Sequence, residues 1–175
     1  VRNIIGNFIR DIGYEPIMHE HSDVAYMQNT PLENDCYKEL SSCDIVVCII
    51  GNHFGSQSSS NDLSITMNEI RHAIKTQKKV YIFVANDVYI ENRTYLRNKD
   101  SGSFAPAYTD DLRIHEFLAD LQAKVTDHVI LPFDTKAYRY EFISIIADLP
   151  LFCKSKVLDF THSLSGAIFL CEAEA

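Results

Sequence analysis

Two short apolar runs limit what this chain can fold into more than any other feature of the sequence. Residues 44–50 (Asp-Ile-Val-Val-Cys-Ile-Ile) and 80–84 (Val-Tyr-Ile-Phe-Val) are rich in β-branched residues, and apolar and polar residues do not alternate within them. Strands that are apolar on both faces are typical of a parallel sheet that helices cover on both sides. We therefore predict that both runs are buried strands of such a sheet.

Helical patterns lie before, between and after the two runs. Residues 2–13 carry apolar residues at helical spacing, and Gly13 ends the pattern as a C-cap residue. Pro31 opens a helix over 31–41, and Ser64 is a suitable N-cap for a helix over 64–76. Elsewhere we expect a strand over 15–19, a helix over 111–124, a strand over 129–132 and a helix over 136–148. This alternation predicts an α/β domain with a parallel sheet and helices on both faces.

The chain departs from this architecture at its start, because doubly wound domains normally begin with a strand and residues 2–13 predict a helix. Either the first strand lies upstream of this sequence, or another segment takes its place. Ala167 to Cys171 is the one spare apolar run long enough to do so. We expect the α/β domain to cover residues 1–150 and a C-terminal extension to cover 151–175, in which Ala167 to Cys171 is the candidate for an extra strand.

Residues 85–110 are the least regular part of the sequence. A connection of this length without a strong pattern is longer than two neighbouring elements need. We expect a short helix, a lid or disorder there.

Composition narrows the functional classes. The 175 residues suffice for one well-packed domain, and a formal net charge of −8 argues against a nucleic-acid duplex or an anionic membrane as partner. No apolar stretch is long enough to span a bilayer, and the first residues do not resemble a signal peptide. Five cysteines without metal-ligand spacing predict neither a disulfide framework nor a zinc site. We therefore expect a cytoplasmic protein without a metal or a cofactor.

The apolar run over 44–50 leads directly into the strongest candidate site. In open α/β sheets, ligands bind outside the carboxyl ends of the strands, where a glycine turn lets the backbone approach closely. Glu69 lies one turn inside the helix that follows this turn and is the candidate catalytic residue. The candidate ligand-binding residues are Gly51, Asn52, His53, Phe54, Gly55, Ser56 and Ser64.

Each of these residues also has a simpler interpretation. On a helical wheel Glu69 lies well off the apolar stripe, so a solvated surface glutamate is the alternative to a catalytic one. His53 is a base or a ribose contact in one interpretation and a polar loop residue in the other. Phe54 either stacks on a ligand base or packs beneath the loop.

The order of these motifs resembles a known family. The acid-led apolar strand, the glycine turn Gly51-Asn52-His53-Phe54-Gly55-Ser56, a polar loop and Ser64-Ile65-Thr66 with Glu69 follow one another as in a family of bacterial TIR-like domains of unknown function. Members of that family stand at the N-termini of signal-transducing ATPases of the STAND type and of antiphage proteins. The resemblance covers roughly residues 2–85. The family pattern also has a strand and a Ser/Thr-rich loop ahead of the first helix, which this sequence does not contain.

The resemblance implies a flavodoxin-like, TIR-like fold and a specific chemistry. Active relatives, including TIR domains and nucleoside deoxyribosyltransferases, use a glutamate early in this helix on an N-glycosidic bond of NAD or a nucleoside, and the matching residue here is Glu69. Cleavage of that bond places positive charge on the ribose, which a carboxylate stabilises or traps. Nicotinamide leaves as a neutral molecule, so a second acid is not required.

Three functions follow from the resemblance. The first is an NAD-cleaving or nucleotide-processing effector in defence or signalling, in which NAD is the substrate and a fused or partner sensor ATPase drives assembly. The second is a non-catalytic TIR-like module that acts by self-association. The third is an enzyme of the nucleoside deoxyribosyltransferase type.

Overall fold

Two fully buried strands form the middle of a parallel sheet. In the computed structural model, which describes residues 2–11, 13–18, 32–102, 104–124, 128–134 and 167–172, the strand order is β1-β5-β2-β3-β4, and every neighbouring pair is parallel. The described strands are β1 (Glu15–Ile17), β2 (Ile45–Ile50), β3 (Lys79–Ala85), β4 (His128–Phe133) and β5 (Ala167–Glu172). All six residues of β2 are buried, as are six of the seven in β3, which confirms the central position predicted for both runs.

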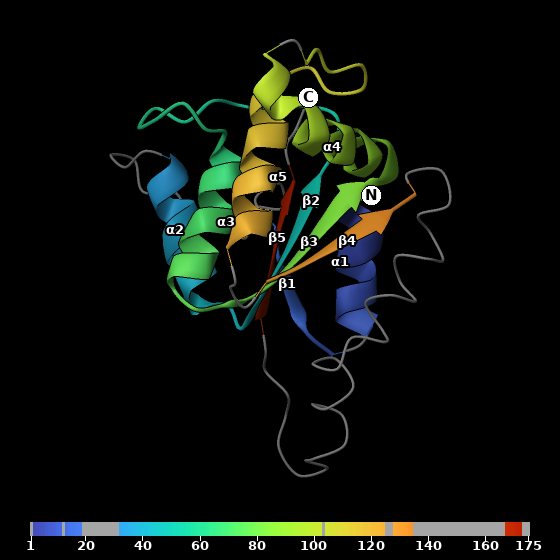
Figure 1. Cartoon of the computed structure of the whole chain (residues 1–175). Helices are drawn as coiled ribbons and strands as arrows, with labels where there is room; N and C mark the ends of the chain where they lie inside the picture. Colours follow the sequence, from blue (N-terminus) through green and yellow to red (C-terminus); the bar gives the residue numbers. More distant parts are fainter. Residues whose placement is uncertain are drawn as a thin grey trace.

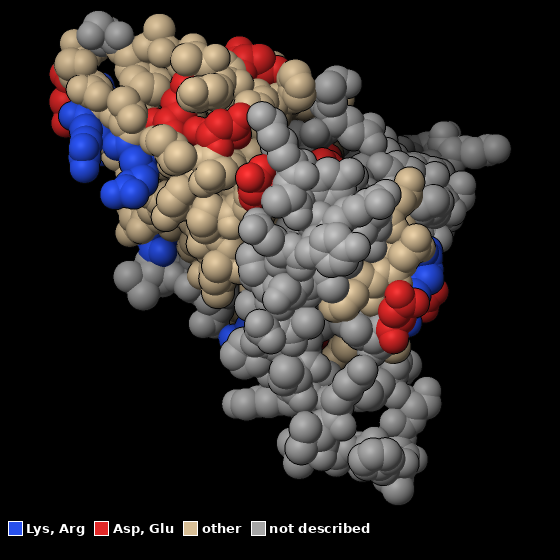
Figure 2. Space-filling model, turned by 90° about the vertical axis from the view of Figure 1, so that its right-hand side faces the viewer, with Lys and Arg blue, Asp and Glu red and all other residues tan. Residues whose placement is uncertain are grey.

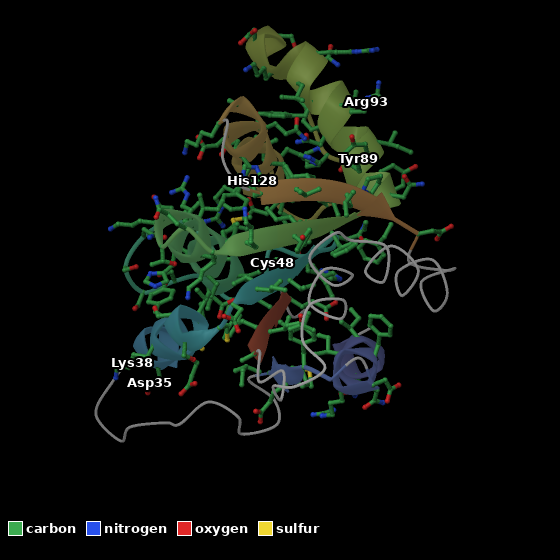
Figure 3. All side chains as sticks on the ribbon, turned by 90° about the horizontal axis from the view of Figure 1, so that it is seen from below. Asp35, Lys38, Cys48, Tyr89, Arg93 and His128 are labelled. Atoms are coloured by element: carbon green, nitrogen blue, oxygen red, sulfur yellow. The ribbon has the colours of Figure 1, made fainter. Side chains whose placement is uncertain are left out.

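Helices cover both faces of this sheet, as Figures 1 and 3 show. Helices α2, α3 and α5 lie on one side, α1 lies on the other, and α4 continues directly from the end of β3 and contacts β3, β4 and α5. The bounds are α1 (Arg2–Asp11), α2 (Leu32–Ser42), α3 (Ile65–Lys75), α4 (Asn86–Asn98) and α5 (Arg113–Ala123), with a short 3₁₀ helix η2 (Lys99–Ser101) after α4. The architecture is a doubly wound, flavodoxin-like α/β fold.

The last strand of the chain occupies an interior position in the sheet. β5 pairs with β1 on one side and with β2 on the other, and its residues Ile168 to Cys171 are buried. Asp44 fixes the start of β5, because its backbone N–H donates to the Ala167 carbonyl (2.9 Å) and its carboxylate accepts from the Ala167 N–H (3.2 Å). With β5 in this place the sheet has the flavodoxin-like order, in which the first strand of the chain normally stands there. Of the two alternatives, the structure therefore shows the second, in which Ala167 to Cys171 takes the place of the first strand.

Local capping explains where the predicted helices begin and end. Gly13 has a φ of +89°, and the Tyr14 N–H donates to the Ile9 carbonyl while the Gly13 N–H donates to the Arg10 carbonyl. This pair of hydrogen bonds is a Schellman motif. The residue after the end of the helix, here Gly13, must adopt a left-handed conformation in it, which glycine does without strain. The predicted N-cap Ser64 is also confirmed, because its side chain accepts a hydrogen bond from the Met67 N–H.

One prediction needs correction and another lies outside the described residues. Residues 85–110 contain not a short helix but the thirteen-residue helix α4, followed by η2. The buried face of α4 consists of Val88, Glu91 and Asn92, and two polar residues at these positions hide the helical period from a search for apolar spacing. The helix predicted over 136–148 lies outside the described residues, as does Pro31.

Candidate functional site

The loop after β2 is built as a closed hairpin-like turn. The Ser58 N–H donates to the Leu63 carbonyl (2.8 Å), the Ile65 N–H donates to the Ser56 carbonyl (3.0 Å), and Gln57 forms an antiparallel bridge with Ser64. The reversal begins at Gly55, whose φ of +76° lies in the left-handed region that glycine adopts without strain. The loop therefore delivers Ser64 to the start of α3 in a defined position.

A second loop, residues 104–112, lies against this turn at the carboxyl end of the sheet. Asp110 joins the two, because its carboxylate accepts from the Phe54 N–H (2.9 Å) and its own N–H donates to the Asn52 carbonyl (3.0 Å). The Asn52 amide in turn donates to the Tyr108 carbonyl (3.0 Å) and to the Asp87 carboxylate (3.2 Å) at the start of α4. These bonds link the ends of β2 and β3 into one surface.

His53 and Asp110 form an exposed imidazole–carboxylate pair on this surface. The His53 Nδ1 lies 3.1 Å from Asp110 Oδ2, and the two side chains are 57% and 50% exposed. A carboxylate that accepts from Nδ1–H leaves Nε2 of the imidazole as the proton acceptor of this half-exposed pair. The pair can therefore accept a proton from water or from a ligand hydroxyl.

Other predicted ligand residues have structural tasks here. Phe54 is buried, and the Arg113 guanidinium lies 3.9 Å from the centre of its ring, so Phe54 packs beneath the loop as its simpler interpretation proposed. Ser64 is buried as the cap of α3. Gly51 has open space where a Cβ would stand, while the Ser56 side chain is exposed.

Glu69 is buried and lies on the inner side of α3. Its side chain is only 6% exposed, which rules out the alternative of a solvated surface glutamate. The Cys36 thiol of α2 donates a hydrogen bond to the Glu69 carboxylate. Burial first, and then the negative charge and hydrogen bond of Glu69, raise the pKa of the Cys36 thiol to about 12. Cys36 is therefore a protonated donor at neutral pH. The described contacts join Glu69 to Cys36 and His53 to Asp110, and none of them joins Glu69 to His53.

A buried polar cluster holds the 104–112 loop from below. The Glu91 carboxylate of α4 accepts from the backbone N–H groups of Ala107, Tyr108 (3.0 Å) and Thr109 (3.2 Å), and His115 Nε2 of α5 lies 2.9 Å from it. Burial raises the pKa of Glu91, but these backbone donors and His115 outweigh burial, so the pKa lies below its ordinary value.

Two further residues complete this cluster. Thr109 Oγ1 lies 3.0 Å from His115 Nε2, and the Asn92 amide donates to the His115 carbonyl (3.1 Å). Asn92 and His115 are fully buried, so the cluster fixes the loop on which Asp110 stands.

Sequence reasoning missed Asp110 and the whole Glu91 cluster. Glu91 and His115 lie 24 positions apart in the sequence, and no motif joins the residues of the cluster. Their contacts therefore exist only in the folded chain. A weak signal was present, since Asp110-Asp111 precedes a helix and Asp111 accepts from the N–H of its first residue, Arg113 (2.8 Å).

Among the described residues, no three His, Cys, Asp or Glu side chains come together as metal ligands. No helix in the same residues is long and apolar enough to cross a membrane. Acidic and basic side chains both occur on the face shown in Figure 2, and the basic ones do not form a continuous stripe over the described residues.

The fold and this edge define a flavodoxin-like α/β domain whose candidate site lies at the carboxyl ends of β2 and β3. The family described as "Domain of unknown function (DUF4062)" matches residues 1–142, and the chain belongs to this family. No curated protein and no solved structure matches the chain.

Proposed function

We propose that this chain is a cytoplasmic TIR-like effector or signalling domain that cleaves the N-glycosidic bond of NAD or a related nucleotide when it is assembled. The observation that carries the proposal is Glu69, a carboxylate only 6% exposed in the second turn of the helix after β2. A buried carboxylate acts through a low dielectric, where its field on a cationic transition state is stronger than in water.

The proposed reaction needs one anion and one proton acceptor. The bond between ribose C1′ and the nicotinamide nitrogen breaks, its electron pair returns to the ring, and nicotinamide leaves neutral. The Glu69 carboxylate stabilises the positive charge on the ribose, and water then attacks C1′. His53, oriented by Asp110 at 3.1 Å, accepts the proton that this water releases. The products are ADP-ribose, nicotinamide and a proton.

The turn and the loops supply binding rather than chemistry in this proposal. Gly51, Gly55 and Ser56 lie beside His53, where the backbone can meet a nucleotide at the carboxyl end of the sheet. A fused or partner sensor ATPase, or self-association, then brings the domains together in bacterial defence or signalling.

A specific observation favours the second candidate, a non-catalytic self-association module. The Cys36 thiol donates to the Glu69 carboxylate where α2 packs on α3. This contact is the one expected if Glu69 has a structural role and no catalytic one. In addition, Ile90 and Tyr108 are 55% and 57% exposed large apolar side chains near the candidate edge.

Product analysis separates these functions. The protein is incubated with NAD, alone and with a crowding agent that drives assembly, and nicotinamide is measured by chromatography. Release of nicotinamide supports the proposal. Concentration-dependent oligomers without nicotinamide favour the self-association module, and base exchange between free nucleosides without NAD cleavage favours an enzyme of the deoxyribosyltransferase type.

A further inference from the structure

A groove between α3 and α5 lies at the opposite end of the sheet from the candidate site. Both helices run from the carboxyl edge of the sheet toward the amino ends of β3 and β4, and Figures 1 and 3 show them side by side. The groove has a volume of about 390 Å³, which falls within the range of small-molecule sites. Its lining consists of Arg71, Ile74, Lys75, Asp120, Leu121 and Lys124.

The groove combines an apolar floor with a positive rim. Ile74 and Leu121 are its apolar residues, and Leu121 is buried. Arg71, Lys75 and Lys124 face a single acid, Asp120, so the lining carries two positive charges more than negative ones. This surplus occurs in a chain with a formal net charge of −8, so the general composition does not account for it.

Asp120 engages two of the three cations. Its Oδ2 lies 2.7 Å from Lys124 Nζ and 3.2 Å from Arg71 Nη2, and the hydrogen bond from Lys124 is the main reason why the pKa of Asp120 lies below its ordinary value. The Arg71 guanidinium also lies 5.6 Å from the centre of the Phe117 ring, which helps to hold it over the groove.

Lys75 is the cation that remains available. Its side chain is exposed, and no described ion pair involves it. Burial lowers the pKa of His72, and the positive charge of Lys75 lowers it further. Its position at the last residue of α3 favours a cation through the helix dipole, yet the dipole alone does not explain why three cations converge on one apolar hollow.

We propose that this groove binds a phosphate ester with an aromatic or apolar body, of the size of a nucleoside monophosphate. The phosphate lies between Lys75, Lys124 and Arg71, where ionised donors form strong hydrogen bonds, and the body covers Ile74, which lies beside the buried Leu121. The site is separate from Glu69 and does not depend on NAD cleavage.

The test uses AMP as the probe, with adenosine and inorganic phosphate as partial probes, in calorimetric titrations of the whole chain. The proposal expects AMP to bind more tightly than either partial probe and to shift the NMR amide signals of Ile74 and Leu121. Lys75→Glu should weaken AMP binding at least about tenfold, whereas the matched exposed control Arg97→Glu on α4 should not.

Other results would overturn it. If AMP does not bind, or if Lys75→Glu and Arg97→Glu weaken binding equally, the groove is not the site. Equal affinity for adenosine and AMP excludes phosphate recognition, and equal affinity for phosphate and AMP excludes a role for the apolar floor. Glu69→Gln should leave AMP binding unchanged, so that failure here and failure of the proposed NAD cleavage remain distinguishable.

Discussion

Two units of the fold, β2 with α3 and α4 with α5, each bury one side of a helix. They differ in the residues through which the helix makes its contacts. In the first, α3 buries the apolar residues Met67, Ile70 and Ala73, and its buried polar residues Thr66, Asn68 and Glu69 lie in its first two turns. In the second, α4 meets α5 through Glu91, Asn92 and His115. Apolar contacts add up without exact geometry, whereas a buried polar group costs free energy unless each partner is in place. The second unit therefore depends on a few specific residues.

The sharpest test of this difference is Glu91→Ala. Removal of one partner from a buried pair leaves His115 and three loop N–H groups without their acceptor, and we expect the free energy of unfolding to fall by about 3–5 kcal/mol. Urea unfolding measures this change. Glu116→Ala, at an exposed position of α5, is the matched control and should change stability by less than about 0.5 kcal/mol. A loss for Glu91→Ala no larger than that of its control would contradict the account of the cluster.

The corresponding change in the first unit is Ile70→Ala. Ile70 is fully buried in the core, so truncation leaves a cavity and should lower the free energy of unfolding by about 2–4 kcal/mol. Ile90→Ala, at an isoleucine that is 55% exposed in the other unit, should cost less than about 0.5 kcal/mol. Equal losses at the two positions would mean that the burial described for α3 is wrong.

Asp110→Ala tests the link between the two units. The Phe54 N–H loses its acceptor and His53 its partner, which should cost about 1 kcal/mol because the site is half exposed. Hydrogen exchange should become faster at the amide of Phe54 and stay unchanged in β3. The exposed acid Asp100 provides the control, and exchange at Phe54 that Asp110→Ala does not accelerate would show that the loops are held by other contacts.

The pH dependence of stability gives the smallest expected effect. The pKa of Glu91 in the folded chain lies below its ordinary value of 4.5, so its ionised form stabilises the fold above that value and this contribution is lost as the pH falls through the folded pKa. Glu91→Gln should therefore unfold with a shallower dependence on pH below about 4.5 than the wild type. Urea midpoints between pH 5 and pH 2.5 measure it, and parallel curves would assign the acid sensitivity to other carboxylates.

The same difference explains how far the sequence alone could predict this molecule. The strands β2 and β3, the cap at Ser64 and the extra strand at Ala167 follow from apolar runs and capping residues, because those signals are local. The helix α4 was underestimated because its buried positions are polar and are satisfied by residues of another helix. Asp110 was missed because its contacts with Asn52 and Phe54 of another loop exist only in the folded chain, while Glu69 was found by position although only the structure shows that it is buried.

The central claim is that the Glu69 carboxylate acts on an N-glycosidic bond, and its most direct test is the rate of nicotinamide release by assembled Glu69→Gln protein. This change keeps the size of the side chain and removes its charge, with the exposed Glu116→Gln as the matched control. We expect the rate to fall at least about 100-fold, equivalent to about 2.7 kcal/mol of barrier, while Glu116→Gln keeps the wild-type rate. Nicotinamide release by Glu69→Gln at the wild-type rate, or no release by the wild type in any assembled state, would contradict the claim.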